Sequence, residues 1–143
     1  MRHGAAALVL LHLFAAPATA ETLVGPVPAV VERVIDGDTL AVRARVWLGQ
    51  DVHVLVRIRG IDTPEIRGRC VEEQRLARVA ARQVAEAVSE GPVTLSHIEG
   101  GKYHGRVLAD VELSDGRDLA ATMLRAGNAR PYEGSARRPW CAG

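Results

Sequence analysis

Residues 29–46 read AVVERVIDGDTLAVRARV, two runs of apolar and β-branched residues on either side of the pair Asp36-Gly37. Such runs around an Asp-Gly pair predict two antiparallel strands, over about Ala29–Ile35 and Thr39–Val46, joined by a tight turn. β-Branched side chains favour strands because they pack well on a pleated surface. The folded part of the chain is therefore expected to start with a β-hairpin.

A third strand and a long helix are expected after the hairpin. Residues 53–61 alternate between two kinds of side chain, as in a strand with two different faces. Apolar residues then recur every three or four positions over 71–89, which predicts an amphipathic helix ended by Gly91-Pro92. The remaining elements are two strands and one short helix, expected at Val93–Ile98, Arg106–Leu113 and Leu119–Ala126.

The predicted order of elements is β-β-β-α-β-β, with one long helix between strands three and four and a short second helix. Short, half-polar strands avoid exposed edges when they close into a barrel. This order is that of an OB-fold, so the predicted class is mainly β with helices (α+β), a five-stranded OB-fold barrel within a domain over 29–143. Residues 21–28 contain one glycine and two prolines without a clear period, and are expected to form a leader segment.

The first twenty residues have the pattern of a secretory signal peptide. Arg2 precedes an apolar stretch over 4–16, and residues 18–20 (ATA) fit an A-x-A cleavage site. A membrane anchor is the alternative, but the apolar stretch is shorter than the roughly 20 residues that a span needs. We expect cleavage of 1–20, a mature protein without membrane attachment, and a periplasmic or secreted location.

Charge and cysteine content narrow the functional classes. The chain has 18 basic and 17 acidic residues, and removal of a signal whose only charge is Arg2 leaves a formal net charge of zero. A neutral chain argues against a protein that coats nucleic acid with high affinity, because such a protein needs a broadly basic surface.

Cys70 and Cys141 are expected to form one disulfide in an exported protein, with two free thiols as the alternative.

Acidic residues stand at two predicted turns. Asp38 follows the Asp-Gly turn, and residues 62–65 (DTPE) follow the third strand. Because hard cations prefer oxygen ligands, Asp38, Asp62 and the carbonyl oxygen of Thr63 are predicted to hold one divalent cation, with Ca²⁺, Mg²⁺ and Mn²⁺ as alternatives. The competing interpretation is that these residues only stabilise the turns. For Asp36, which is in the Asp-Gly pair, this turn role is the favoured interpretation.

Two arginines and a glutamate complete a candidate site for a phosphodiester. Arg57 and Arg106 are predicted to hold phosphate oxygens, because guanidinium groups offset the charge that grows as water attacks phosphorus. Glu65 is predicted to accept a proton from that water or to orient it. Strict alternation puts Arg57 and Asp62 on opposite faces of the strand, so Gly60 must mark a bend or bulge for both to reach one site.

The aromatic residues and histidines carry weaker signals. Tyr103, His104 and Tyr132 are candidates for nucleotide contact, with ordinary surface roles as the alternative. Trp47 and Trp140 are expected to be packing residues. The histidine spacing does not match a zinc site, and the sequence has no Gly-rich phosphate loop. The chemistry that remains is metal-assisted hydrolysis.

The sequence resembles the staphylococcal nuclease (thermonuclease) family in the order and approximate spacing of its motifs, from about residue 30 to 130. These motifs are Asp38 after the Asp-Gly turn, Arg57 in the third strand, the run 62–65 and Gly105-Arg106 after the long helix. The resemblance implies an OB-fold nuclease that uses one Ca²⁺, hydrolyses DNA and RNA with little sequence preference and leaves 3′-phosphate ends. It implies calcium binding by Asp38, Asp62 and Thr63, phosphate binding by Arg57 and Arg106, and a role for Glu65 toward the attacking water.

The sequence thus predicts an exported, monomeric nuclease whose substrate is DNA, RNA or both. Two alternatives keep the fold and change the function: a non-catalytic OB-fold module that binds single-stranded nucleic acid, and a periplasmic interaction domain with a vestigial site. Binding modules of this kind rely on basic grooves and stacking aromatics, whereas this chain has two Trp and two Tyr. The interaction domain would be favoured if the site residues did not converge.

Overall fold

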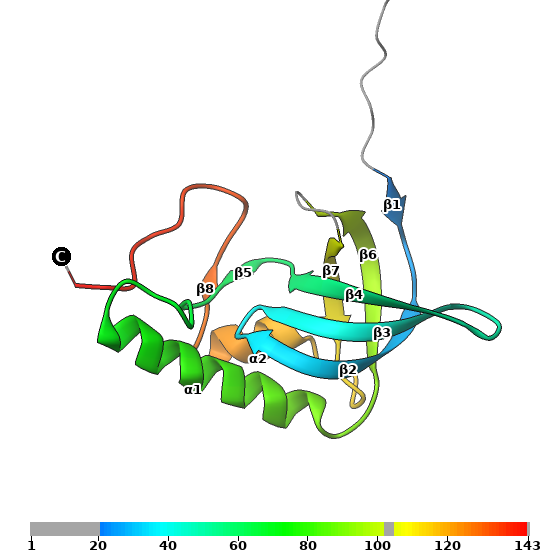
Figure 1. Ribbon diagram of the computed structural model, residues 1–143, viewed down its shortest axis with the longest axis horizontal. Helices are drawn as coiled ribbons and strands as arrows, with labels where there is room; N and C mark the ends of the chain where they lie inside the picture. The colour runs from blue at the N-terminus through cyan, green and yellow to red at the C-terminus, as the bar shows by residue number, and fades with distance from the viewer. Residues whose placement is uncertain (1–20, 102–104, 143) are drawn as a thin grey trace, which may run out of the picture.

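Five strands close into a barrel in the computed structural model, which describes residues 21–101 and 105–142 (Figure 1). The barrel strands are β2 (Val27–Asp36), β3 (Thr39–Trp47), β4 (Gln50–Ile58), β6 (Val93–Gly100) and β7 (Arg106–Glu112). They pair in the order β2-β3-β4-β7-β6, and β6 pairs back with β2. All pairs in the ring are antiparallel except β4 with β7. The predicted OB-fold barrel is confirmed.

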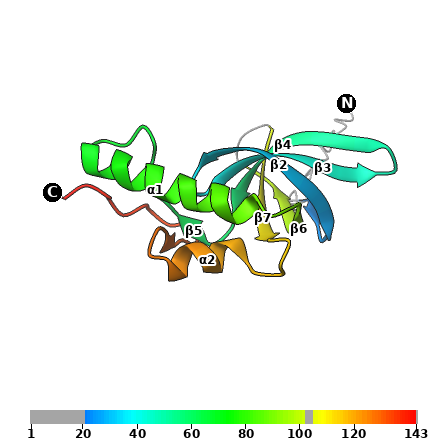
Figure 2. The same cartoon turned by 90° about the horizontal axis from the view of Figure 1, so that it is seen from below.

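Two helices pack on the barrel in the predicted order. Helix α1 (Val71–Val88) lies between β5 (Ile61–Asp62) and β6 along the chain and packs on β2, while α2 (Leu119–Arg125) packs on β7 and α1. Figure 2, which is seen from below, shows the two helices side by side. The side chain of Asp118 caps α2 by accepting the N–H of Ala121 at 2.6 Å. No helix within 21–101 or 105–142 is long and apolar enough to cross a membrane.

The sheet starts before the predicted first strand. Strand β1 (Thr22–Leu23) pairs with β6, and Val27 and Pro28 of β2 also pair with β6. All four residues lie within the segment expected to be a leader. Its glycine and prolines concealed the strand character, because Pro and Gly are depleted in strands.

The core fills the barrel and the space between the barrel and the helices. β2, β3, β4, β6 and β7 each contribute buried apolar residues, and both helices add to the same cluster. The largest fully buried apolar side chains are Leu40, Ile58, Ile61, Leu95, Leu119 and Met123. Asp38, Asp62, Thr63 and Glu73 are also buried, so polar groups of the candidate site are embedded at the border of this core.

Trp47 does not pack in the core, and that prediction was wrong. Its side chain is 72% exposed at the end of β3, next to Leu48, which is still more exposed. Figure 1 shows that the β3–β4 hairpin runs past the other strands and projects from the barrel. The tip of the hairpin therefore lies beyond the elements that bury the rest of the two strands.

Candidate active site

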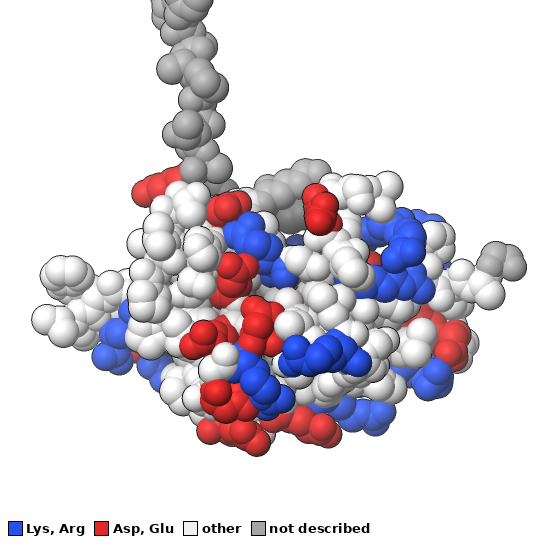
Figure 3. All heavy atoms as spheres, turned by 180° about the vertical axis from the view of Figure 1, so that it is seen from behind, with Lys and Arg blue, Asp and Glu red and all other residues white. Residues whose placement is uncertain are grey.

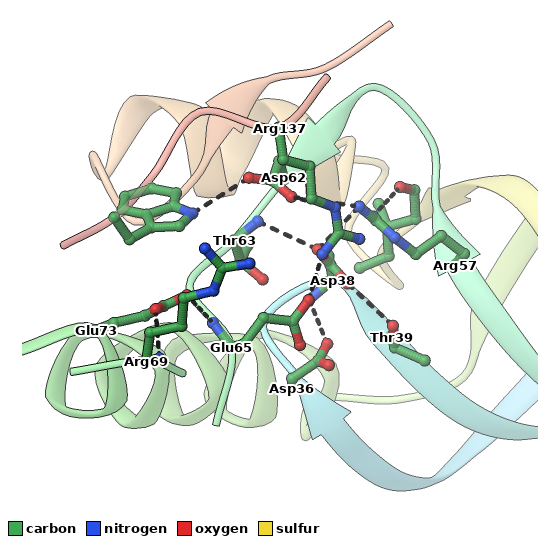
Figure 4. Close-up of polar contacts among 12 residues, drawn as sticks. Asp36, Asp38, Thr39, Arg57, Asp62, Thr63, Glu65, Arg69, Glu73 and Arg137 are labelled. Carbon is green, nitrogen blue, oxygen red and sulfur yellow. Dashed lines mark hydrogen bonds and ion pairs between the residues drawn. The ribbon is translucent and has the colours of Figure 1, made fainter. Parts of the chain in front are cut away.

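The candidate site lies where three segments distant in sequence meet (Figure 4). The turn between β2 and β3 supplies Asp38, and the end of β4 with β5 and the following residues supplies Arg57, Asp62 and Thr63. The C-terminal tail, residues 132–142, supplies Arg137. The barrel fixes the first two segments, and the tail is fixed by a disulfide.

The tight turn that carries Asp38 is held from two sides. The carboxylate of Asp36 accepts the N–H of Asp38 at 3.1 Å, which is the expected role of this aspartate in the turn. Gly37 lies against α1 and against Thr63, the residue after β5, since a Cβ at this position would be 2.7 Å from the Cβ of Ala80 and 3.0 Å from that of Thr63. Only glycine allows this close approach of the turn to the helix.

Asp38 has polar partners at both of its carboxylate oxygens. Its Oδ1 accepts the hydroxyl of Thr39 at 2.9 Å, and its Oδ2 accepts the N–H of Thr63 at 3.1 Å. The Arg57 Nη2 lies 3.0 Å from the same Oδ2. Burial raises the pKa of Asp38 above its usual value, and the charge of Arg57 only partly opposes this effect.

A bend at Gly60 brings Arg57 and Asp62 to the same side. Strand β4 ends at Ile58, Gly60 has φ of +80°, and Asp62 then belongs to the separate short strand β5. A φ of this sign favours glycine because it has no Cβ. After the bend, Arg57 Nη2 lies 4.0 Å from Asp62 Oδ1. Strict alternation along one strand would have placed Arg57 and Asp62 on opposite faces, and the bend at Gly60 explains why they lie together.

Three buried polar atoms of the site lack a hydrogen-bond partner among the described residues: Arg57 Nη2, Asp62 Oδ1 and Thr63 Oγ1. The arginine nitrogen and the aspartate oxygen are in ion pairs, but these do not have hydrogen-bond geometry. Buried polar groups are normally satisfied, so unsatisfied groups in one place need an explanation. An oxygen pair beside Asp38 fits a hard cation, and a spare guanidinium N–H fits a phosphate oxygen.

Glu65 lies at the edge of the site, on a loop that Glu73 anchors. The Glu65 side chain is about half exposed and pairs with Arg137. Glu73, in the first turn of α1, is buried and accepts the N–H of Glu65 at 3.3 Å and the N–H of Arg69 at 2.9 Å. Glu73 thus determines where the loop carries Glu65, a role that sequence reasoning missed.

The C-terminal tail reaches Asp62, which sequence reasoning also missed. Arg137 Nε lies 3.1 Å from Asp62 Oδ1, and Trp140 Nε1 donates to Asp62 Oδ2 at 3.2 Å. Trp140 does pack, since the Arg130 guanidinium stacks 3.6 Å from its ring centroid, but it also bonds to the site.

The predicted disulfide between Cys70 and Cys141 is present, and it joins residues 71 positions apart. Figures 1 and 2 show the tail beside the start of α1 as a result. The signal that could have found the tail contacts was in the sequence. A bridge that starts five residues after Glu65 necessarily brings the residues before Cys141 close to that glutamate.

The other predicted residues take different positions. Arg106 is paired in register with Leu55, which places Arg106 on the same face of the sheet as Arg57. Tyr132 lines a cavity of about 430 Å³ together with Arg57, and its N–H donates to the carbonyl of Gly60 at 3.0 Å. Tyr103 and His104 lie outside the described residues.

Comparison with known proteins finds one matching family model and two similar curated proteins. A family model described as "Staphylococcal nuclease homologue" matches residues 55–139, more than half of the chain. An uncharacterized endonuclease of Escherichia coli is 34% identical over 105 residues, which is 72% of this chain and 60% of the relative. A protein of Escherichia coli O157:H7 with the same description matches to the same extent. The chain thus spans about 60% of the length of these curated relatives.

Proposed function

This chain belongs to the staphylococcal nuclease family, and from that premise we propose that it is an exported, divalent-cation-dependent nuclease that hydrolyses phosphodiester bonds of DNA, RNA or both. One observation carries the proposal. Arg57 Nη2, Asp62 Oδ1 and Thr63 Oγ1 are buried beside Asp38 without hydrogen-bond partners among the described residues. One donor and two oxygens of this kind suit a phosphate and a cation.

The proposed cation is Ca²⁺, held by Asp38, Asp62 and Thr63. Such an ion supplies charge stabilisation to the phosphate oxygens when it is bound. Hydrogen bonds from Thr39 and from the Thr63 N–H orient the Asp38 carboxylate before any ligand arrives. Preorganised groups of this kind need little rearrangement during the reaction.

Arg57 is proposed to hold the scissile phosphate. Its Nη1 donates to the carbonyl of Ile58 at 3.0 Å and its Nη2 faces Asp38, so the guanidinium has a fixed orientation. The N–H groups without a hydrogen-bond partner in the described part of the chain, including those of Nη2, can bond to phosphate oxygens and offset their growing charge. Arg106, on the same face of the sheet, is proposed to assist from the neighbouring strand.

Glu65 is proposed to orient the attacking water or to accept its proton. Its side chain is 47% exposed, which gives it access to water, and its loop is fixed by the bond from its own N–H to Glu73. A positioned carboxylate of this type contributes roughly 10²–10⁴-fold to a reaction rate.

The test of this function is cation-dependent cutting by purified protein expressed from the full-length chain. We expect degradation of plasmid DNA and of RNA in the presence of Ca²⁺, and loss of cutting after chelation. Arg57→Gln and Glu65→Gln should each reduce the rate by roughly 10²-fold or more. Plasmid and RNA that stay intact with Ca²⁺, Mg²⁺ and Mn²⁺ would refute the proposal.

Matched controls separate the site from general charge effects. Arg59 is two residues from Arg57, just after the end of β4, but it pairs with Asp110 at 3.1 Å and Glu99 at 3.4 Å. Arg59→Gln should therefore retain activity, and Glu86→Gln on the exposed surface of α1 is the equivalent control for Glu65. Equal activity of Arg57→Gln and Arg59→Gln would contradict the assigned role of Arg57.

Export is the second part of the proposal. The Cys70–Cys141 disulfide supports it, because disulfides persist mainly in oxidising compartments. Fractionation of cells that express the full-length chain should recover the protein outside the cytoplasm, with Glu21 as its N-terminal residue. Recovery in the cytoplasm with Met1 or Arg2 at the N-terminus would contradict it.

A further inference from the structure

A second cavity, here called the tail cavity, lies beside the candidate cation site. It has a volume of about 460 Å³, and it is lined by six of the residues 62–69, by Glu73 and by residues 137–142 of the tail. Asp62, Thr63 and Glu65 belong both to its wall and to the candidate active site. We propose that the tail cavity is a second phosphate-binding site, which holds a phosphate of the substrate strand next to the one that is cut. The inference rests on the proposed nuclease function.

Unpaired arginines are the first argument for this site. Four arginines line the tail cavity, and one of them, Arg137, is held by the site carboxylates. The side chains of Arg67, Arg69 and Arg138 are exposed and form no ion pair or hydrogen bond within the described parts of the chain. Three spare guanidinium groups around one cavity are suited to an anion, because their planar forks match phosphate oxygens.

The acidic residues of the tail cavity do not fully cancel this charge, because its lining has four arginines and three acidic residues, Asp62, Glu65 and Glu73. Asp62 accepts a hydrogen bond from Trp140, and Glu65 is paired with Arg137. Glu73 is only 7% exposed, and its two carboxylate oxygens accept backbone N–H groups of the loop. The uncompensated charge that faces the cavity is therefore positive.

The direction of Arg69 supports the link to the catalytic centre. Figure 4 shows its side chain extending from the start of α1 toward Thr63, whereas Arg57 approaches the carboxylates from the opposite side. One phosphate held by Arg57 and another held in the tail cavity would thus flank the same carboxylates. Successive phosphates of a single strand meet this condition, and an isolated mononucleotide with one phosphate does not.

The positive charge at the tail cavity is local. The whole chain has a formal net charge of +1, and Figure 3 shows basic and acidic side chains interspersed on the face that it presents. A protein of this kind gains little from long-range attraction to a polyanion. Contacts in the tail cavity therefore give it a specific means to prefer a strand with several phosphates over a dinucleotide.

The test measures binding in a chelator, so that cutting is not needed. A fluorescently labelled single-stranded oligothymidylate is titrated with the full-chain protein at several salt concentrations, and a dinucleotide serves as competitor. The variant carries Arg67→Gln, Arg69→Gln and Arg138→Gln. The control removes the same charge at exposed positions outside the cavity, with Arg33→Gln, Arg78→Gln and Arg82→Gln. Thermal melts followed by circular dichroism verify that both proteins fold.

We expect the cavity variant to bind the oligonucleotide at least roughly tenfold more weakly than the control, since each lost bond to a charged group is worth about a factor of ten. The slope of log affinity against log salt should become shallower by about 0.7 for each lost phosphate contact. Arg69→Glu alone should weaken binding further than Arg69→Gln. Competition by the dinucleotide should change little.

Equal affinities and equal salt slopes for the cavity variant and the control would overturn the inference. This outcome is distinguishable from failure of the proposed function. A wild-type protein that binds the strand through the tail cavity but cuts no nucleic acid contradicts the nuclease proposal alone. A protein that cuts normally, and whose affinity for the oligonucleotide is unchanged in the cavity variant, contradicts the second phosphate site alone.

Discussion

Removal of the Cys70–Cys141 disulfide is the most informative perturbation, because this bond links the tail to the site. The bond joins residues 71 positions apart, and the chain-entropy relation gives a loss of about 4 kcal/mol in the free energy of unfolding for a loop of this length. For a domain of this size, that loss corresponds to a melting temperature lower by roughly 10–20 °C.

The design of the variant matters at Cys70, which also caps α1. Its Sγ accepts the N–H of Glu73 at 3.4 Å. Cys70→Ser keeps an acceptor at this position, and serine is among the best N-cap residues, whereas Cys70→Ala would add about 1 kcal/mol from the lost cap. The double variant Cys70→Ser/Cys141→Ser therefore isolates the effect of the cross-link.

The assay combines urea denaturation with the fluorescence of Trp140. The sequence has two tryptophans, so Trp47→Phe leaves Trp140 as the only indole, and its N–H donates to Asp62. Loss of the disulfide should shift the Trp140 emission toward that of solvent-exposed tryptophan before the barrel unfolds. Addition of a reductant should reproduce the shift in the Cys-containing protein and have no effect on the double serine variant.

One result would refute the reasoning. The result is a free energy of unfolding for the double serine variant that is lower by less than about 1 kcal/mol, together with unchanged Trp140 emission. In that case the disulfide would neither restrict the conformations of the unfolded chain nor hold the tail against Asp62. A loss of stability without a change in emission would keep the entropic argument and reject the link between the bond and the site.

Three further predictions follow from the geometry of the site. Gly37→Ala should cost about 1–3 kcal/mol, because its Cβ would lie 2.7 Å from the Cβ of Ala80; urea denaturation measures the loss, and Ala80→Gly in the same chain should restore part of it. Arg57→Lys should lower kcat roughly 10²-fold in a nuclease assay, since a point charge does not replace the fork that faces Asp38; near-normal kcat would argue against phosphate binding by the guanidinium. The raised pKa of Asp38 means that its ionised form destabilises the folded ion-free protein at neutral pH, and that protonation relieves this cost as the pH falls through that pKa. Because cation binding needs the ionised form, Ca²⁺ should raise the melting temperature more at pH 8 than at pH 5, and an equal rise at both would contradict this account.

Much of the fold could be predicted because local residue patterns indicate its strands and helices. Alternation and β-branched residues over 29–46 locate the hairpin, and the three-to-four spacing over 71–89 locates α1. The start of β2 and the strand β1 escaped, because the glycine and prolines among residues 21–28 are uncommon in strands. Trp47 was misplaced because residue type does not reveal how far a hairpin extends beyond its neighbours.

The site was predictable only where its residues lie close to conspicuous turns. Asp38 and the run 62–65 belong to such turns, and the bend at Gly60 was required by the face conflict between Arg57 and Asp62. Glu73 escaped because an acid in the first turn of a helix is ordinarily a surface residue. The tail residues escaped because their contacts depend on the Cys70–Cys141 bridge, which joins segments far apart in the sequence.

The contacts of Asp62 also have a consequence for the order in which the molecule matures. Its carboxylate bonds to Trp140, 78 positions later, so a nascent chain exposes Asp62 without this partner until the tail has left the ribosome. Contacts across such a separation are slow to form, because the loop entropy is lost before the contact is gained. The barrel strands can pair earlier, and docking of the tail is then the step that completes the site. We therefore expect assembly of the site to depend on oxidation of Cys70 and Cys141.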